Sequence, residues 1–171
     1  MKTKLLTLAI FLLSATAVFA QSTPTTVILV RHAEKEAQPA NDPPLTAAGV
    51  SRAGAIAASL KDAGVALVIT NQFARTGQTA QIIADSLHVS VVREPLADIN
   101  AWTAALAKHA KAHGGHTIVI VGHSNTFGLI SKAMGGPVLP NAPDAEYDNM
   151  YILTVQDGQP TKVIRAKQKS E

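Results

Sequence analysis

Two histidines placed beside anion-binding groups are the residues of this chain best suited to chemistry. His32 follows Arg31 at the end of one apolar run, and His123 follows a second apolar run. Arg75 stands in a segment after a third run. Guanidinium groups match phosphate oxygens with paired hydrogen bonds, and imidazole serves as a nucleophile or a proton donor. These four side chains therefore predict an anion pocket, provided that the fold brings them together.

Buried strands alternate with amphipathic helices along the chain, and these elements must position the four side chains. Short apolar runs predict strands, and apolar residues at helical spacing predict the helices that cover them. Thr46 and Asn100 are the expected N-caps, and Asp157-Gly158 predicts a hairpin turn. The expected strands are 27–30, 65–70, 89–93, 117–121, 150–155 and 161–166, and the expected helices are 47–63, 76–87, 101–113 and 124–134. This order predicts an α/β fold, a three-layer sandwich with a mostly parallel central sheet, helices on both faces and a C-terminal antiparallel hairpin.

The two histidines are expected at the same edge of this sheet. In open sheets of this class, ligands bind beyond the carboxyl ends of the strands, where neighbouring connections diverge to opposite faces. If the two strands are neighbours, His32 and His123 converge there. Ser124 begins the expected helix after His123, so backbone N–H groups add positive potential for an anion. The loops 34–44 and 135–148 are expected to cover the pocket, with Lys35 at its rim.

The first twenty residues are typical of a secretory signal. Two lysines precede an apolar stretch, and a small-residue region ends at Ala20. This order predicts cleavage before Gln21, and hence a periplasmic or secreted protein. A retained membrane anchor is the alternative, although the apolar stretch is shorter than the roughly 20 residues that a bilayer requires. We expect residues 1–20 to be a signal peptide and residues 21–171 to form one domain.

Composition narrows the classes of partner and cofactor. The 171 residues are 47% hydrophobic and 16% charged, which is typical of one globular domain of ordinary size. The absence of cysteine excludes a zinc finger, an iron–sulfur cluster and a thiol nucleophile. Without Lys2 and Lys4, 13 basic residues face 12 acidic ones, and so we expect no nucleic-acid partner and no membrane partner after cleavage. We expect a monomer, because no exposed apolar helix stands out.

Four motifs in series resemble those of the histidine phosphatase superfamily, the phosphoglycerate mutase-like proteins. They are Arg31-His32-Ala33-Glu34-Lys35, Leu45-Thr46-Ala47-Ala48-Gly49 with Arg52-Ala53, Ala74-Arg75-Thr76-Gly77-Gln78-Thr79-Ala80, and Val121-Gly122-His123-Ser124-Asn125-Thr126. They span nearly the whole chain after residue 20. The resemblance implies a metal-independent phosphoric monoester hydrolase without a cofactor, acting on a small phosphorylated molecule.

The resemblance also implies a role for each pocket residue. His32 is the expected nucleophile that becomes phosphorylated, and Arg31, Arg75 and His123 are expected to hold the phosphoryl group. The arginines should lower the pKa of His32 and favour its neutral form, whereas His123 should act as a cation or a hydrogen-bond donor. Asn71 stands where the family commonly has a small hydroxyl residue, and we expect it to alter loop contacts without abolishing the chemistry.

The proton donor to the leaving alcohol is ambiguous in the sequence. Many relatives carry a Glu in a Leu-x-Glu pattern after the third strand, and Leu96-Ala97-Asp98 is the nearest match here. Asp98 is the favoured donor. Glu146 and Asp148 are the alternatives, because they precede a strand that should start at the same edge, and Glu34 is a weaker candidate.

Other functions remain open at this point. The chain could be a catalytically silent phosphate-binding module, a mutase, or a protein phosphohistidine phosphatase of the same fold. The serine-hydrolase elbow fails, because Thr126 stands where its second glycine is needed. His109 and His113 could bind a metal at helical spacing, but the neighbouring lysines favour a solvated face.

Overall fold

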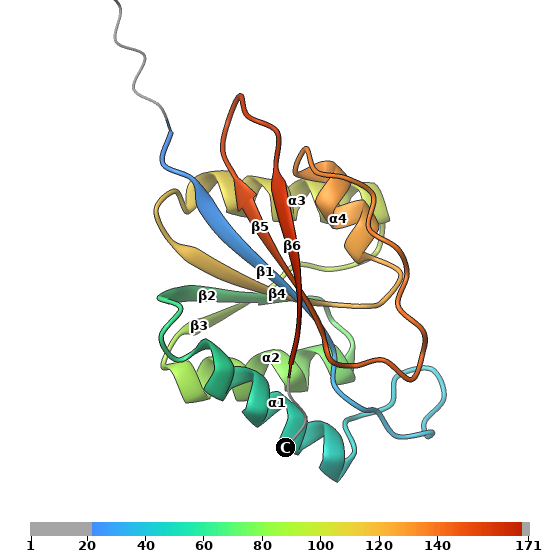
Figure 1. The fold of residues 1–171 in the computed structure, drawn as a ribbon. Coiled ribbons are helices and arrows are strands. Elements are labelled where there is room, and N and C mark those ends of the chain that lie inside the picture. Colours follow the sequence, from blue (N-terminus) through green and yellow to red (C-terminus); the bar gives the residue numbers. More distant parts are fainter. Residues whose placement is uncertain (1–21, 169–171) are drawn as a thin grey trace, which may run out of the picture.

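A single mixed sheet organises the part of the chain that the computed structural model describes, residues 22–168. The predicted signal peptide lies outside these residues. The strands are β1 (Thr25–Arg31), β2 (Val65–Thr70), β3 (Ser90–Arg93), β4 (Thr117–Gly122), β5 (Asn149–Val155) and β6 (Lys162–Lys167), in the order β3-β2-β4-β1-β5-β6. The helices are α1 (Ala47–Leu60), α2 (Ala74–Leu87), α3 (Ile99–Ala112) and α4 (Phe127–Ala133) (Figure 1).

The predicted fold class is confirmed by the strand directions and the layers. Strands β1 to β4 run parallel, and β5 pairs antiparallel with both β1 and β6. In Figure 1, α1 and α2 lie below the sheet and α3 and α4 lie above it. Alternate residues of β1 enter two separate cores: Val27 and Leu29 pack with α3 and α4, and Ile28 and Val30 pack with α1 and α2. A strand covered on both faces explains the continuous apolar run in the sequence.

Strand β1 lies beside β4, which is the condition for the two histidines to meet. The pairing runs from Thr26 opposite Thr117 to Arg31 opposite Gly122. The chain leaving β1 continues to α1 on one face, whereas the chain leaving β4 continues to α4 on the other. The carboxyl ends of β1 and β4 therefore form the diverging point at which ligands bind in such sheets.

Three helix starts differ from the sequence-based expectation. Helix α2 starts at Ala74 rather than at Thr76, so Arg75 lies in its first turn. The N-cap of α3 is Asp98 rather than Asn100, because the Asp98 carboxylate accepts a hydrogen bond from the backbone N–H of Ala101 at 2.7 Å. Helix α4 starts at Phe127 rather than at Ser124. The Thr126 hydroxyl accepts from the backbone N–H of His123 at 3.0 Å and donates to its carbonyl at 2.9 Å, so residues 123–126 form a turn before the helix.

Local contacts place the loop after β1 over the start of α1. The Thr46 side chain accepts from the N–H of Gly49 at 3.0 Å, as predicted for an N-cap. Gly49 lies so close to the Glu34 carbonyl that a Cβ at this position would stand 2.1 Å from its oxygen. Only glycine fits this approach, which sets the path of the chain directly after His32.

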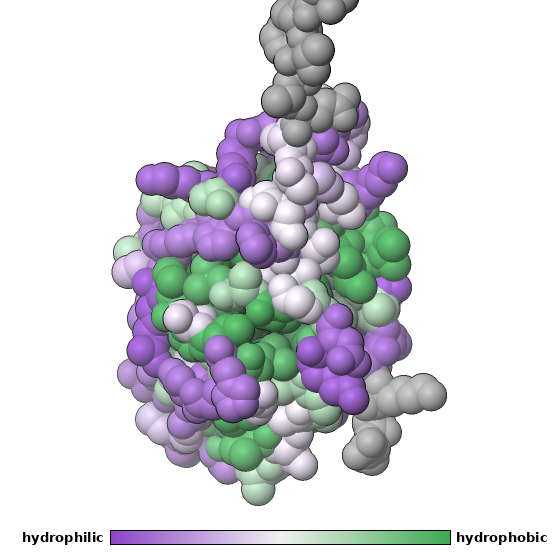
Figure 2. Space-filling model, turned by 90° about the vertical axis from the view of Figure 1, so that its left-hand side faces the viewer, coloured by the Kyte–Doolittle hydropathy of each residue, from purple (hydrophilic) through white to green (hydrophobic). Residues whose placement is uncertain are grey.

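Strands β1 to β4 begin at the side of the molecule opposite to their carboxyl ends. Figure 2 looks at the side that lies on the left of Figure 1, where β1 and β2 begin, and shows hydrophobic surface bordered by hydrophilic residues. Among residues 22–168, no helix is long and apolar enough to cross a membrane.

Candidate active site

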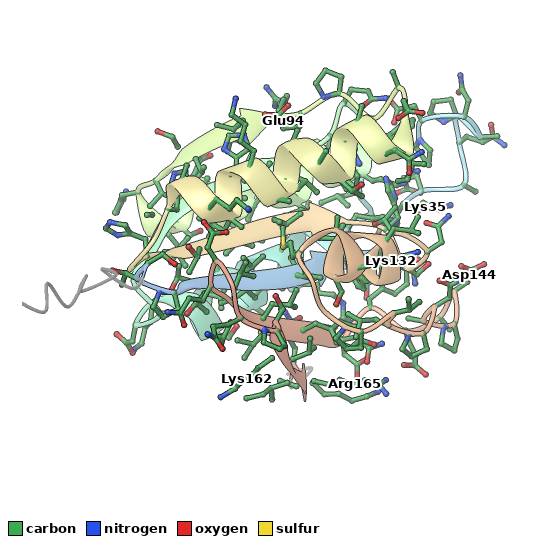
Figure 3. The ribbon with its side chains drawn as sticks, turned by 90° about the horizontal axis from the view of Figure 1, so that it is seen from above. Lys35, Glu94, Lys132, Asp144, Lys162 and Arg165 are labelled. Carbon is green, nitrogen blue, oxygen red and sulfur yellow. The ribbon has the colours of Figure 1, made fainter. Side chains whose placement is uncertain are left out.

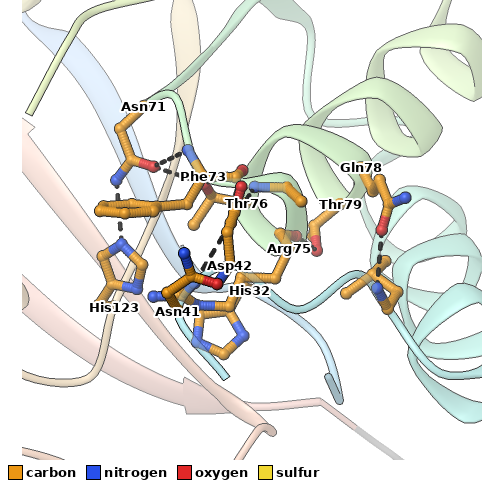
Figure 4. A network of polar contacts seen from close by, with 12 residues as sticks. His32, Asn41, Asp42, Asn71, Phe73, Arg75, Thr76, Gln78, Thr79 and His123 are labelled. Carbon is orange, nitrogen blue, oxygen red and sulfur yellow. Dashed lines mark hydrogen bonds and ion pairs between the residues drawn. The ribbon is translucent and has the colours of Figure 1, made fainter. Parts of the chain in front are cut away.

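His32 and His123 face each other at the carboxyl ends of β1 and β4. Their ring centroids are 5.3 Å apart, with the ring planes at 65° (Figure 4). The convergence expected from the two strand ends is therefore present in the structure. The two rings come from positions far apart in the chain, and the pairing of β1 with β4 brings them together.

His32 presents a free ring nitrogen to the pocket. Its side chain is 3% exposed, and its Nδ1 lies 2.9 Å from the Ala33 carbonyl oxygen. A carbonyl oxygen can only accept, so Nδ1 carries the proton and Nε2 keeps its lone pair. Burial lowers the pKa of His32 to about 4, and the positive charges of Arg31 and Arg75 act in the same direction. His32 is therefore a neutral imidazole at pH 7, as a nucleophile requires.

His123 is also neutral at pH 7. Burial lowers its pKa to about 3, and the neighbouring His32, Arg75 and Arg31 act in the same direction. Its Nε2 lies 3.1 Å from the side-chain amide nitrogen of Asn71. Of the two roles expected for His123, cation or donor, the low pKa favours the neutral donor.

Arg31 forms hydrogen bonds with the loop that precedes β5. Its Nη1 donates to the backbone carbonyl oxygens of Pro143, Asp144 and Glu146 at 3.1, 2.9 and 3.0 Å. Its guanidinium carbon lies 4.2 Å from the centroid of the Tyr147 ring. The buried Nε has no hydrogen-bond partner among the described residues. Nη1 is therefore committed to the loop, whereas the buried Nε has no partner.

Arg75 lines the cleft, and two of its guanidinium nitrogens have no hydrogen-bond partner among the described residues. Its guanidinium carbon lies 4.8 Å from the centroid of the Phe73 ring, and its Nη1 is 3.7 Å from a carboxylate oxygen of Asp42. Nε and Nη1 are buried, and neither has a hydrogen-bond acceptor within residues 22–168. Burial lowers the pKa of Arg75, which the Asp42 carboxylate partly offsets. Buried donors without acceptors are costly, and an anion such as phosphate would satisfy them.

A cleft of about 930 Å³ opens over the histidines and extends away from them. Lys35 and Asp144 reach its rim from two different loops at the same end of the molecule (Figure 3). The lining of the cleft includes apolar side chains from α4, from the start of α3 and from the segments before α2 and α3: Leu129, Ile99, Phe73, Leu96 and Ala97. Leu129 is 44% exposed. A group attached to a bound phosphoryl would therefore meet both apolar and polar walls.

The structure separates the candidate proton donors. Asp98 lines the cleft, although one of its carboxylate oxygens also caps α3. Glu146 and Asp148 do not line it: they lie 3.6 and 3.1 Å from the Lys167 ammonium on β6. A hydrogen bond from Asn149 lowers the pKa of Glu146, which disfavours it as an acid. Both carboxylates therefore face basic residues of β6, and neither is among the residues that line the cleft.

Two other carboxylates, those of Glu34 and Asp144, differ in their position relative to the cleft. Glu34 faces Arg52, whose Nε donates to it at 2.6 Å, so it is not turned toward the histidines. Asp144 lines the cleft, and its fully exposed carboxylate lies 3.6 Å from Nη2 of Arg31. Sequence reasoning did not single out Asp144, since a loop carboxylate gives no local signal of its position.

The remaining predicted residues fall into two groups. Ser124 and Lys35 line the cleft, although Ser124 stands in a turn and not at the start of a helix. His109 is paired with Glu94 at 2.7 Å, and His113 contacts the His109 carbonyl, so neither joins the cleft. No cluster of three or more potential metal-ligating side chains occurs within residues 22–168.

Sequence reasoning missed the contact between Asn71 and His123. Asn71 is fully buried, and its amide oxygen also accepts from the backbone N–H of Phe73 at 3.2 Å (Figure 4). The signal that could have found it was the departure from a small hydroxyl residue at this position. Asn71 contacts the backbone at Phe73, and its amide also reaches a histidine of the site.

The described chain is thus an α/β protein in which two histidines and two arginines line one cleft. Residues 27–101 match the family model described as histidine phosphatase superfamily (branch 1). The predicted resemblance to this superfamily is confirmed over these residues.

Curated relatives match a part of the chain. A probable phosphoglycerate mutase GpmB of Proteus mirabilis is 41% identical over 75 residues, which are 40% of this chain and 35% of the relative. The protein of the same name from Yersinia enterocolitica is 40% identical over 75 residues, with the same coverage. The match therefore spans about a third of the length of these relatives.

Solved structures resemble the chain over most of its length. The protein histidine phosphatase SixA complexed with tungstate has a TM-score of 0.68 at 19% identity, covering 84% of this chain and 97% of that one. YhfR of Bacillus stearothermophilus has a TM-score of 0.67 at 19% identity, covering 85% and 98%. A mycobacterial glucosyl-3-phosphoglycerate phosphatase with VO3 has a TM-score of 0.65 at 13% identity, covering 84% and 99%. At these identities the likeness shows the fold alone.

Proposed function

We propose that this protein hydrolyses a phosphomonoester through a phosphohistidine intermediate on His32. The observation that carries the proposal is the free Nε2 of a buried, neutral His32 beside guanidinium donors without acceptors among the described residues. A neutral imidazole and a concentrated positive field are the two requirements of phosphoryl transfer to histidine.

The first half of the reaction transfers the phosphoryl group to the enzyme. The Nε2 lone pair of His32 attacks phosphorus in line, and the bond between phosphorus and the ester oxygen breaks. Arg31 Nε and the Nε and Nη1 of Arg75 supply donors to the phosphoryl oxygens. Such preorganised donors stabilise the charge of the transition state more than that of the ground state.

The leaving alcohol must gain a proton as its bond to phosphorus breaks. We keep Asp98 as the proposed donor, and Asp144 is the other carboxylate that lines the cleft. In the second half-reaction the same group takes a proton from water, whose oxygen attacks the phosphohistidine. Inorganic phosphate leaves and His32 returns to its neutral form, so the cycle balances without a further reactant.

A mutase is the second candidate, because the curated relatives are named as probable phosphoglycerate mutases. The solved structures named as a protein histidine phosphatase and a glucosyl-3-phosphoglycerate phosphatase share the fold of this chain, so the fold is compatible with hydrolysis and does not separate the two candidates. The two candidates differ in the acceptor of the second step, which is water in a phosphatase and a substrate hydroxyl in a mutase.

We also propose that the protein is exported and monomeric. The composition of residues 1–20 supports cleavage near Ala20 and a periplasmic or secreted location. A phosphorylated small molecule met outside the cytoplasm is the substrate class consistent with this location.

The full chain and its His32→Ala variant, assayed with p-nitrophenyl phosphate, test the proposal. The variant should lose turnover while inorganic phosphate still binds, and the wild type should form an acid-labile phosphoenzyme. His109→Ala is the matched control, because that histidine lies outside the cleft and should leave turnover unchanged. Full turnover in His32→Ala, or a wild type that binds phosphate without any hydrolysis, would contradict it. In a parallel assay with 3-phosphoglycerate as substrate, formation of an isomerised phosphoglycerate in place of inorganic phosphate would favour the mutase.

A further inference from the structure

The side-chain amide of Asn71 joins His123 to the start of α2. Asn71 is fully buried directly after β2, and its Nδ2 lies 3.1 Å from Nε2 of His123. Its Oδ1 lies 3.2 Å from the backbone nitrogen of Phe73 and 2.5 Å from the hydroxyl of Thr76 (Figure 4). All of these contacts belong to one partly buried network beside the histidine pair.

The orientation of this amide is determined by its neighbours. The backbone N–H of Phe73 can only donate, so the atom that it meets must be the amide oxygen. A reversed amide would set two donors against each other. The Nδ2 group must therefore point at His123, and it can only donate.

A donor at Nε2 of His123 has one consequence for the proton of that ring. Nε2 must accept, so the proton of the neutral imidazole stands on Nδ1. In Figure 4 this second nitrogen faces the side on which His32 lies. We propose that Asn71 is a positioning residue that holds His123 as the Nδ1–H tautomer and so presents a hydrogen-bond donor to the phosphoryl site. The proposal rests on the proposed function only for the identity of the group that accepts this hydrogen bond.

The two histidines then carry the same tautomer but present opposite ends to the pocket. His32 uses its Nδ1–H on the Ala33 carbonyl and offers the Nε2 lone pair, whereas His123 offers its N–H. A serine or threonine at position 71 would not impose this choice, because a hydroxyl can rotate to donate or to accept. An amide whose oxygen is already committed has no such freedom.

The charged and titratable groups around His123 all belong to residues that line the cleft. His32 and Arg31 face it from the end of β1, and Arg75 faces it from α2. Lys35, Asp98 and Asp144 line the same cleft. Burial and the nearby cations keep the pKa of His123 at about 3, so the neutral form is the one whose tautomer matters at pH 7.

Nitrogen NMR of the full chain labelled with [15N]histidine tests the tautomer directly. The wild type should show the His123 proton on Nδ1 at pH 7, assigned by loss of the signal in His123→Gln. Asn71→Ser should give a mixture of tautomers. Asn71→Asp places a group that only accepts at Nε2, so Nε2 should become protonated and the pKa of His123 should rise. Thr25→Val, which removes a buried hydroxyl bonded to the Ala110 carbonyl, controls for a general loss of stability and should leave the tautomer unchanged.

The pH dependence of turnover gives a second readout. Above the raised pKa of His123, Asn71→Asp should lose about 10²-fold in kcat, the usual cost of one donor to a transition-state oxyanion. Activity should recover as pH falls through that pKa, since the imidazolium donates from both nitrogens, whereas the wild type should be flat in this range. A wild-type His123 protonated on Nε2, or an Asn71→Asp variant with unchanged tautomer and pH profile, would overturn the proposal. If the wild type hydrolyses no phosphomonoester, the NMR result still decides the tautomer, so the two failures are distinguishable.

Discussion

Replacing Arg75 with methionine separates stability from anion binding. Arg75 Nε is buried without an acceptor among the described residues, and Nη1 has only the Asp42 carboxylate at 3.7 Å. One unsatisfied buried donor costs about 1–3 kcal/mol. The change also removes an ion pair worth about 0–1 kcal/mol and a contact with Phe73 worth about 0.5–1 kcal/mol. We expect Arg75→Met to be more stable than the wild type by about 1 kcal/mol without an anion, or about 2–4 °C in Tm.

The same variant should respond differently to phosphate. Wild-type stability should rise by about 2.7 kcal/mol at a phosphate concentration of 100 Kd, because phosphate binds the folded chain only. Arg75→Met should gain little, and its turnover should fall by about 10²- to 10³-fold. Urea unfolding in a phosphate-free buffer and again with phosphate measures both effects. Arg93→Met is the control, since this exposed arginine lies on β3 outside the cleft.

A destabilisation of Arg75→Met by more than about 1 kcal/mol in the phosphate-free buffer would refute this reasoning. It would mean that the buried guanidinium stabilises the fold even without an anion, and that its unpaired N–H groups carry little cost. Equal stabilisation of both proteins by phosphate would show that the anion binds elsewhere.

Three further predictions follow from the cleft. The pKa of His32 in the folded chain, about 4, lies below its ordinary value of 6.5, so kcat/KM should fall only as pH drops through about 4. Because the unfolded chain takes up protons at higher pH than the folded chain, the free energy of unfolding measured with urea should also fall between about pH 6.5 and 4. Asp98→Asn should slow alkyl phosphates more than p-nitrophenyl phosphate, and an equal loss on both would count against Asp98 as the acid. Leu129→Ser should lower kcat/KM by about 10-fold for phosphates with an apolar leaving group, because about 1–2 kcal/mol of apolar contact is lost. It should spare glycerol phosphate, whose leaving group is polar. An equal effect on the two kinds of substrate would show that Leu129 does not touch the leaving group.

Much of the fold could be predicted because each buried strand and helix leaves a local pattern. The expected strand 65–70 is β2 as observed, and the other elements agree within a few residues, because burial on one or two faces sets the apolar spacing. The starts of α3 and α4 were wrong because they depend on single side chains. Asp98 and Thr126 both form hydrogen bonds that no periodicity reveals.

By itself the sequence determined which residues could form the pocket: two histidines and two arginines, each placed by an apolar run that must end at the carboxyl edge of a sheet. Three features appear only in the tertiary structure. Strands β1 and β4 are neighbours, Arg31 donates hydrogen bonds to loop carbonyl oxygens, and Asn71 contacts His123. The tertiary structure also turns Glu146 and Asp148 toward β6. The physical reason is the sequence separation of the residues that interact. Burial patterns and helix caps involve residues a few positions apart, so a local pattern reveals them. Strand order and buried hydrogen bonds join residues far apart in the chain and depend on the packing of the whole domain.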